Sequence, residues 1–122
     1  MDKAQAIHEF WSGFRLPAYD ESSVPDDAVM PYITYNVATD SLDSVLPLHG
    51  SLWYRSTAWD EITQKSEEIA EVLGTNGYLI KKLDNGYVWM QKGRPFAQRM
   101  TDEDEQVRRI YINVTAEFLT AY

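Results

Sequence analysis

The sequence predicts one α+β domain, with a small, largely antiparallel β-sheet flanked by two main helices. Three observations lead to this fold class. The 122 residues provide one hydrophobic core but too little chain for two. Two segments, about 3–12 and about 58–73, repeat apolar residues at helical spacing. Much of 30–122 otherwise alternates apolar and polar residues as strands do. The order helix, two strands, helix and three or four strands favours helices on one face of the sheet.

The first element is a helix of about residues 3–12. Asp2 precedes it and suits the N-cap, where a short polar side chain accepts hydrogen bonds from free backbone N–H groups. Gly13 and Pro17 are expected to end it. Its apolar side consists of Ile7, Phe10, Trp11 and Phe14.

A polar segment of about residues 15–29 follows and holds two prolines among turn-forming residues, so it is predicted to be an exposed loop. It is long for a compact domain, and a role in contacts is one interpretation. Residues 30–38 and 48–55 are rich in β-branched and aromatic side chains and predict two strands, with a loop at 39–47 between them.

The second strand leads directly into the best-signalled helix, about residues 58–73. Thr57 is placed to cap it with Asp60 three residues on, and Gly74 is expected to end it in a left-handed conformation. No residue on this helix is a catalytic candidate, which indicates a scaffold. Its narrow apolar face consists of Trp59, Ile62, Ser66, Ile69 and Leu73.

A β-hairpin is predicted after a turn at residues 75–77. The segments 78–83 and 87–91 flank Asp84-Asn85-Gly86, and Asn-Gly accepts the positive φ angles of tight turns. The aromatic residues here and in the second strand alternate, so some members are expected in the core and the outward-facing ones are candidates for an interface. These aromatic residues are Trp53, Tyr54, Tyr87 and Trp89.

Gly93 and Pro95 interrupt the pattern before a short predicted strand, 96–100, and an acidic turn, 102–105. The last strand, 107–119, alternates most clearly and is therefore expected inside the sheet. Its apolar side consists of Ile110, Ile112, Val114, Ala116 and Phe118.

The charge distribution is uneven. The chain has a net charge of −8, which argues against a nucleic-acid reader because such proteins show a dominant basic patch. Between Tyr78 and Met100, however, five basic residues face Asp84 alone. A monomer with two oppositely charged regions is one interpretation. The other is that one region meets the opposite region of a neighbouring copy, which gives a head-to-tail assembly.

No catalytic, cofactor-binding or metal-binding residue is predicted. Cysteine is absent, which excludes disulfides and thiol chemistry. His8 and His49 lack partners at metal-ligand spacing, and no nucleophile elbow or phosphate loop occurs. Asp26-Asp27 and Asp102–Glu105 lack the spacing of a calcium loop and are interpreted as solvated turns. No apolar run is long enough to span a bilayer, and the N-terminus does not resemble a signal peptide, so a soluble protein made in the cytoplasm is expected.

Two runs, WYRST-WDEI and PFAQRM continuing to RRIYIN, resemble tail terminator, or tail completion, proteins of long-tailed bacteriophages. The likeness covers about residues 30–122. It implies a structural protein of the virion tail, at the head-proximal end, assembled in the host cytoplasm and without enzymatic activity. Such proteins form a ring, usually a hexamer, that ends growth of the tail tube and docks the head. The implied partners are other copies of the chain, the tail tube protein and a neck protein, with DNA passing through unbound and no membrane contact.

In such a ring, the basic stretch of one copy is hypothesised to face acidic residues of the next copy. The turn at residues 93–95 has two interpretations: it presents Arg94 and Phe96 to a partner, or it is an ordinary connection between strands. Asp40 and Asp43 are alternative acidic partners. The candidate interface residues are Lys81, Lys82, Lys92, Arg94, Phe96, Arg99, Asp20, Glu21, Asp26 and Asp27.

Three other functions stay open. A head-completion (neck) protein would bind the portal side instead. An acidic DNA mimic or small adaptor would need carboxylates spread over one surface, but the basic stretch interrupts them. A small enzyme would need a nucleophile–base pair or metal ligands, and the sequence offers neither.

Overall fold

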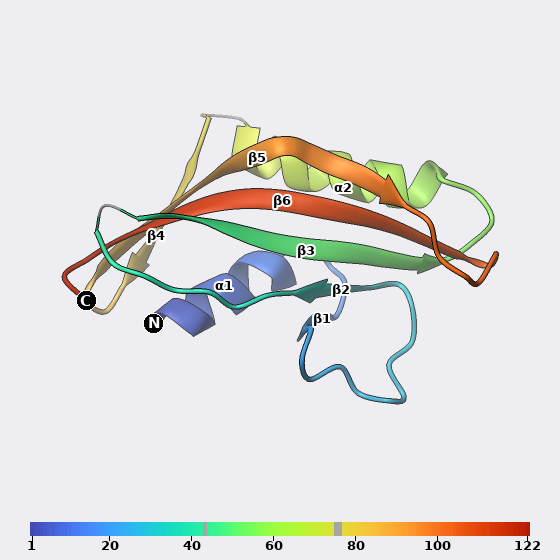
Figure 1. Ribbon diagram of the computed structural model, residues 1–122, viewed down its shortest axis with the longest axis horizontal. Coiled ribbons are helices and arrows are strands. Elements are labelled where there is room, and N and C mark those ends of the chain that lie inside the picture. Colours follow the sequence, from blue (N-terminus) through green and yellow to red (C-terminus); the bar gives the residue numbers. More distant parts are fainter. Residues whose placement is uncertain (43, 75–76) are drawn as a thin grey trace.

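The computed structural model describes residues 1–42, 44–74 and 77–122. Its described strands form one sheet in the order β1-β2-β3-β6-β5-β4 (Figure 1). β1 and β2 pair in parallel, whereas the other neighbouring strands are antiparallel. In chain order the elements are α1 (Lys3–Ser12), β1 (Ala18–Asp20), β2 (Tyr32–Tyr35), β3 (Val45–Arg55), α2 (Asp60–Gly74), β4 (Leu79–Leu83), β5 (Gly86–Met100) and β6 (Val107–Thr120).

The predicted fold class, a small sheet flanked by two helices, is wrong. Strands take 44% of the structure and helices 21%, and the six-stranded sheet curls into a half-barrel. The reason is strand length, because β3, β5 and β6 run for 11, 15 and 14 residues. Long neighbouring strands accumulate twist, which bends a sheet out of a flat layer. The protein is therefore mostly β.

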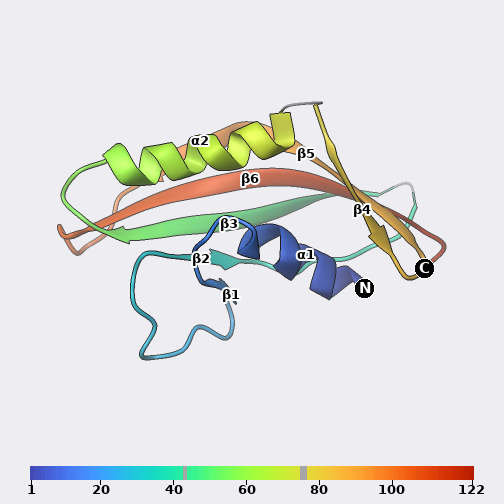
Figure 2. The ribbon, with the colours of Figure 1, turned by 180° about the vertical axis from the view of Figure 1, so that it is seen from behind.

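Both helices lie on the same face of the sheet, which we call the inner face (Figure 2). α2 packs on β3, β5 and β6, whereas α1 contacts β1 and β4. The predicted alternation of the last strand is confirmed, since Ile110, Ile112 and Phe118 are buried on this face. Its predicted position inside the sheet is also confirmed, because β6 lies between β3 and β5.

Trp11 is the largest fully buried side chain and joins α1 to the sheet. Gly50 of β3 makes room for its ring, because a Cβ atom at this position would lie 2.7 Å from two ring carbons. Phe10 and Phe14 surround the same region with edge-to-face ring contacts. The predicted apolar side of the first helix is thus confirmed as part of the core.

The two helices differ in how well their ends were predicted. Asp2 caps α1 through a capping box with Gln5, as expected of its position. The predicted cap of α2 is wrong: the helix begins at Asp60, and the Trp59 carbonyl accepts the first helical hydrogen bond from Thr63. Gly74 lies within α2 and not in a left-handed conformation. Residues 75 and 76 of the predicted turn lie outside the described residues.

Strand boundaries account for the other corrections. The predicted loop of 15–29 contains β1, and the predicted strand of 30–38 is only Tyr32–Tyr35. Its pairing with β1 depends on a neighbour that local composition does not reveal. The segments 87–91 and 96–100 belong to one strand, β5, because a bulge between Lys92 and Ala97 absorbs the extra residues and accommodates Pro95.

None of the helices among the described residues is both long and apolar enough to cross a membrane.

Candidate assembly interface

The predicted basic residues do not form one patch. Lys81 and Lys82 are neighbours in β4, so their side chains point to opposite faces of the sheet. Lys92 lies against Gly74 at the C-terminal end of α2. Arg99 lies against Trp59 at the N-terminal end of α2, about 20 Å away along a helix of 15 residues. The structure therefore divides these four basic residues among four places.

Lys81 forms an ion pair within its own chain. Its Nζ donates to Glu9 Oε1 of α1 at 2.8 Å. This hydrogen bond and the lysine charge lower the pKa of Glu9 below the ordinary value of 4.5. Lys81 therefore holds α1 to β4, which argues against its predicted role between subunits.

Arg99 contributes to a cluster at the end of the sheet. Its guanidinium lies 4.6 Å from the Trp59 ring centroid, and that of Arg108 lies 5.3 Å from it. Arg108 donates to the backbone carbonyls of Thr57, Glu105 and Val107. Arg99 has no carboxylate partner in the described part of the chain, so its charge remains available at the surface. Both runs that carry the phage resemblance contribute to this cluster, through Trp59, Arg99 and Arg108.

The predicted turn at residues 93–95 is a bulge within β5, and it exposes one of the two contact residues predicted there. Arg94 is exposed and forms no ion pair with the residues that the structure describes. Phe96 is half-buried and packs against the core, with Lys92 Nζ 5.9 Å from its ring centroid. Arg94 thus remains an interface candidate, whereas Phe96 partly serves the core.

The acidic candidates lie in and after β1. Glu21 Oε2 is 3.2 Å from His49 Nε2 of β3, which ties the start of the β1–β2 loop to the sheet. Asp26 and Asp27 are exposed in this loop and have no ion-pair partner among the described residues. They are therefore the acidic residues most available to a partner.

Asp20 stabilises the turn that starts the β1–β2 loop. Its carboxylate accepts hydrogen bonds from the backbone N–H and the hydroxyl of Ser22, at 3.0 and 2.8 Å. These bonds lower the pKa of Asp20 below the ordinary value of 3.8 because they favour the charged form. A lowered pKa in the folded state stabilises the fold above the ordinary value, and this stabilisation is lost as pH falls through the lowered value.

We therefore expect Ser22→Ala to raise the pKa of Asp20 part of the way towards its ordinary value, since the backbone donor remains. NMR titration of the Asp20 carboxyl carbon would measure the change. Ser23→Ala is the matched control, because Ser23 contacts Asp20 through its backbone N–H alone. An Asp20 titration that is unaffected by Ser22→Ala would contradict this assignment.

Acidic and basic regions lie at opposite edges of the sheet. From residue 16 to residue 54 the chain contains no lysine or arginine. This stretch forms β1, β2 and most of β3, whereas the basic stretch lies on β4 and β5 at the other edge. Among the described residues, none of the acids of this stretch forms an ion pair with a lysine or arginine of the basic stretch. Of the acids in this stretch, Asp20, Glu21, Asp26 and Asp27 lie in or after β1. Asp40 lies beside the C-terminal end of β6, where Lys3 Nζ donates to its backbone carbonyl and to that of Tyr122, and Asp43 lies outside the described residues.

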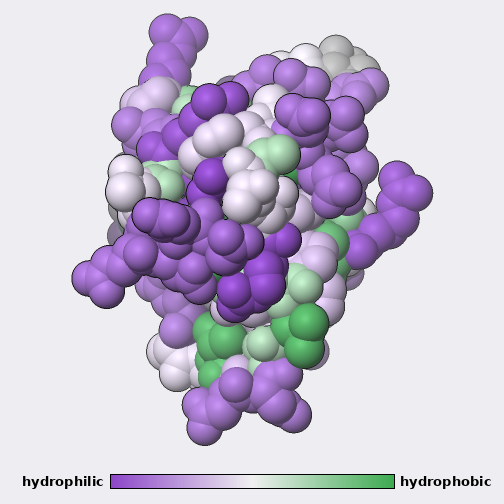
Figure 3. Space-filling model, turned by 90° about the vertical axis from the view of Figure 1, so that its right-hand side faces the viewer, coloured by the Kyte–Doolittle hydropathy of each residue, from purple (hydrophilic) through white to green (hydrophobic). Residues whose placement is uncertain are grey.

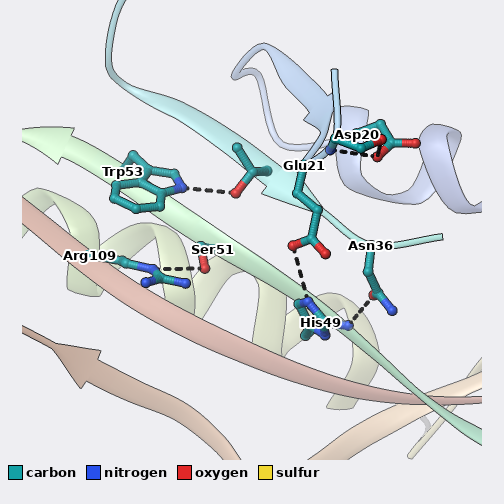
Figure 4. Close-up of polar contacts among 9 residues, drawn as sticks. Asp20, Glu21, Asn36, His49, Ser51, Trp53 and Arg109 are labelled. Carbon is teal, nitrogen blue, oxygen red and sulfur yellow. Dashed lines mark hydrogen bonds and ion pairs between the residues drawn. The ribbon is translucent and has the colours of Figure 1, made fainter. Parts of the chain in front are cut away.

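The face of the sheet opposite the helices, the outer face, carries a polar cluster that the sequence did not reveal (Figure 4). Trp53 Nε1 donates to Thr34 Oγ1 at 2.9 Å, and the Arg109 guanidinium stacks 4.6 Å from the Trp53 ring centroid. Arg109 Nε also donates to Ser51 Oγ at 3.1 Å. These contacts join side chains of β2, β3 and β6 to one another. The sequence alone could not predict this cluster, because the register of β2, β3 and β6 is what brings its residues together.

The outer face is apolar over β4 and β5. Ile80 pairs with Trp89 and Trp89 with Glu117, which in turn pairs with Val45 of β3. Tyr78 makes an edge-to-face contact with Trp89, and Tyr87 belongs to the neighbouring row. We call Val45, Tyr78, Ile80, Tyr87 and Trp89 the outer apolar patch. Trp89 and Tyr87 had been interface candidates by their alternation, whereas Tyr54 is buried in the core.

In the described part of the chain, no three histidine, aspartate or glutamate side chains gather as metal ligands would. The chain matches no protein-family model, and no curated protein matches it. What the surface does must therefore be inferred from its own geometry.

Proposed function

We propose that the protein is a structural subunit of a bacteriophage tail terminator ring, which caps the tail tube and offers a docking surface to the head. The observation that carries the proposal is the opposite charge of the two sheet edges. A surface of this kind matches the opposite edge of a second copy, and repeated head-to-tail contacts close into a ring when the rotation between copies allows it.

Two further observations support the proposal. The segments that carry the phage resemblance meet in space around Trp59, although they are about 40 residues apart in the chain. In addition, the net charge of −8 suits a channel through which DNA slides, because few free cations are available to release phosphate counterions.

The ring is tested first by the phenotype of a phage that lacks the gene. We expect tails of uncontrolled length in electron micrographs, since nothing would stop tube growth. Complementation with the intact gene should restore a single length. Tails of normal length without heads would instead assign the protein to the neck, the second candidate, and would reject termination.

The charge contact is tested in solution. Light scattering of the purified protein with tail tube protein should show a ring-sized species at low salt that weakens as salt rises. The double variant Asp26→Lys with Asp27→Lys should weaken it further. Glu67→Lys, on the exposed polar side of α2, is the matched control and should leave assembly unchanged. A salt-indifferent monomer in every mixture would reject the proposal.

A further inference from the structure

The outer apolar patch is exposed on an edge of the sheet. Val45 is 64% exposed, Ile80 49% and Tyr87 48%. Among the described elements no helix covers this face, since both pack on the inner one (Figures 1 and 2). β4 is also an edge strand: among the described strands it pairs with β5 alone. A contiguous apolar patch beside an unpaired edge strand indicates a contact surface.

The β1–β2 loop, residues 21–31, has the complementary features. Val29 is 77% exposed. Asp26 and Asp27 stand beside it, and prolines at 25 and 31 limit the conformations of the loop. Figure 3 shows hydrophobic residues gathered near the lower end of the molecule, bordered by hydrophilic ones, where this loop lies in Figure 1.

Charge complementarity selects the occupant of the patch. Lys82 pairs in register with Tyr87 at the border of the patch, and it has no carboxylate partner among the described residues. Asp26 and Asp27 lack basic partners likewise. Glu117 lies at the other side of the patch, between Trp89 and Val45, and would repel an acidic loop there. An incoming loop is therefore directed towards β4.

The loop does not lie on the patch of its own chain, because it follows β1 at one edge of the sheet and the patch includes β4 at the other. We infer that the β1–β2 loop of one copy docks on the outer apolar patch of the next, with Val29 against Ile80 and Asp26 or Asp27 near Lys82. This inference rests on the proposed ring and names its contact. Closure of the ring would add to the stability of each such contact, because a closing contact forms within one assembly.

The chain contains no cysteine, so introduced cysteines can report this contact directly. Val29→Cys in one copy and Ile80→Cys in another, mixed at low salt under mild oxidation, should form a disulfide-linked dimer. The double variant in one chain should form a ladder of oligomers. Val72→Cys is the matched control: Val72 is 44% exposed, but it belongs to α2 on the inner face. We expect its cross-linking to Val29→Cys to be at least about fivefold weaker.

Charge variants provide the second readout. Lys82→Glu should reduce cross-linking between the two cysteine positions by about fivefold, as expected for one exposed ion pair turned repulsive. Adding Asp26→Lys and Asp27→Lys to the loop-bearing copy should restore it. Equal cross-linking of Val29→Cys to Ile80→Cys and to the control Val72→Cys would overturn the docking contact.

The failure of this contact and of the ring are distinguishable. If ring-sized species form with tail tube protein but the Val29–Ile80 disulfide does not, the docking contact is wrong and the ring stands. If neither forms, both are rejected.

Discussion

Trp11→Ala is expected to lower the free energy of unfolding by about 3–5 kcal/mol, as large aromatic truncations in cores do. Trp11 is fully buried and connects α1 to β3 beside Gly50. Its removal leaves a cavity that the curved sheet cannot close without losing its pairing. Urea denaturation followed by circular dichroism would measure the loss. Trp11→Phe should cost less, because the indole Nε1 is buried without a hydrogen-bond partner in the described structure.

The contact with Gly50 provides the control for this prediction. Gly50→Ala places a methyl group 2.7 Å from the ring and should cost about 1–3 kcal/mol. Trp11→Leu removes the ring and so relieves the clash. Gly50→Ala and Trp11→Leu should therefore cost less together than the sum of their separate effects. Additive losses, or a loss below about 1 kcal/mol for Trp11→Ala, would mean that the ring does not pack on β3.

Gly86→Ala is the second substitution with a large expected effect, a loss of about 2–5 kcal/mol from backbone strain and overlap together. Gly86 has φ 151°, and a Cβ atom there would lie 2.1 Å from the carbonyl oxygen of Leu119 in β6. That oxygen belongs to the backbone of a central strand and cannot move aside cheaply. The substitution should therefore separate the β4–β5 hairpin from β6 and remove the outer apolar patch with it.

Gly77→Ala is the control that introduces backbone strain without steric overlap. Gly77 has φ 80°, but a Cβ atom there would meet nothing within 4 Å. It should cost only about 1 kcal/mol, the price of a positive φ for alanine. Denaturation of both variants by urea, with the Val29–Ile80 cross-link as a second readout, would compare them. Equal losses for the two glycines would show that the overlap with Leu119 is absent.

Local sequence signals predicted the parts of the fold that depend on nearby residues. The cap at Asp2 and the alternation of β6 were correct in position. The β4–β5 hairpin was also predicted correctly, but its turn is only residues 84–85, because Gly86 already pairs with Leu83. Each of these signals acts over a few residues, so the surrounding fold could not easily override it.

The candidate interface residues differ in how the fold places them. Lys81 and Phe96 have roles within their own chain, whereas Arg94, Asp26 and Asp27 remain at the surface without ion-pair partners in the described chain. Charge counting along a sequence cannot distinguish these cases, because neighbouring residues in a strand point to opposite faces. The sequence did not show that Val29 and Ile80 are exposed, because isolated apolar residues resemble core residues until their face is known.

The approximate positions of the two helices, the hairpin and the face of the last strand were thus determined by the sequence alone, since periodicity and turn-forming residues act over residues close together in the chain. Tertiary structure alone decided that β1 joins the sheet, that β5 continues through its bulge and that the whole sheet curls. It also decided that the acidic and basic regions occupy opposite edges. These properties depend on the register between distant strands, and that register is set by which side chains pack together once the chain has folded.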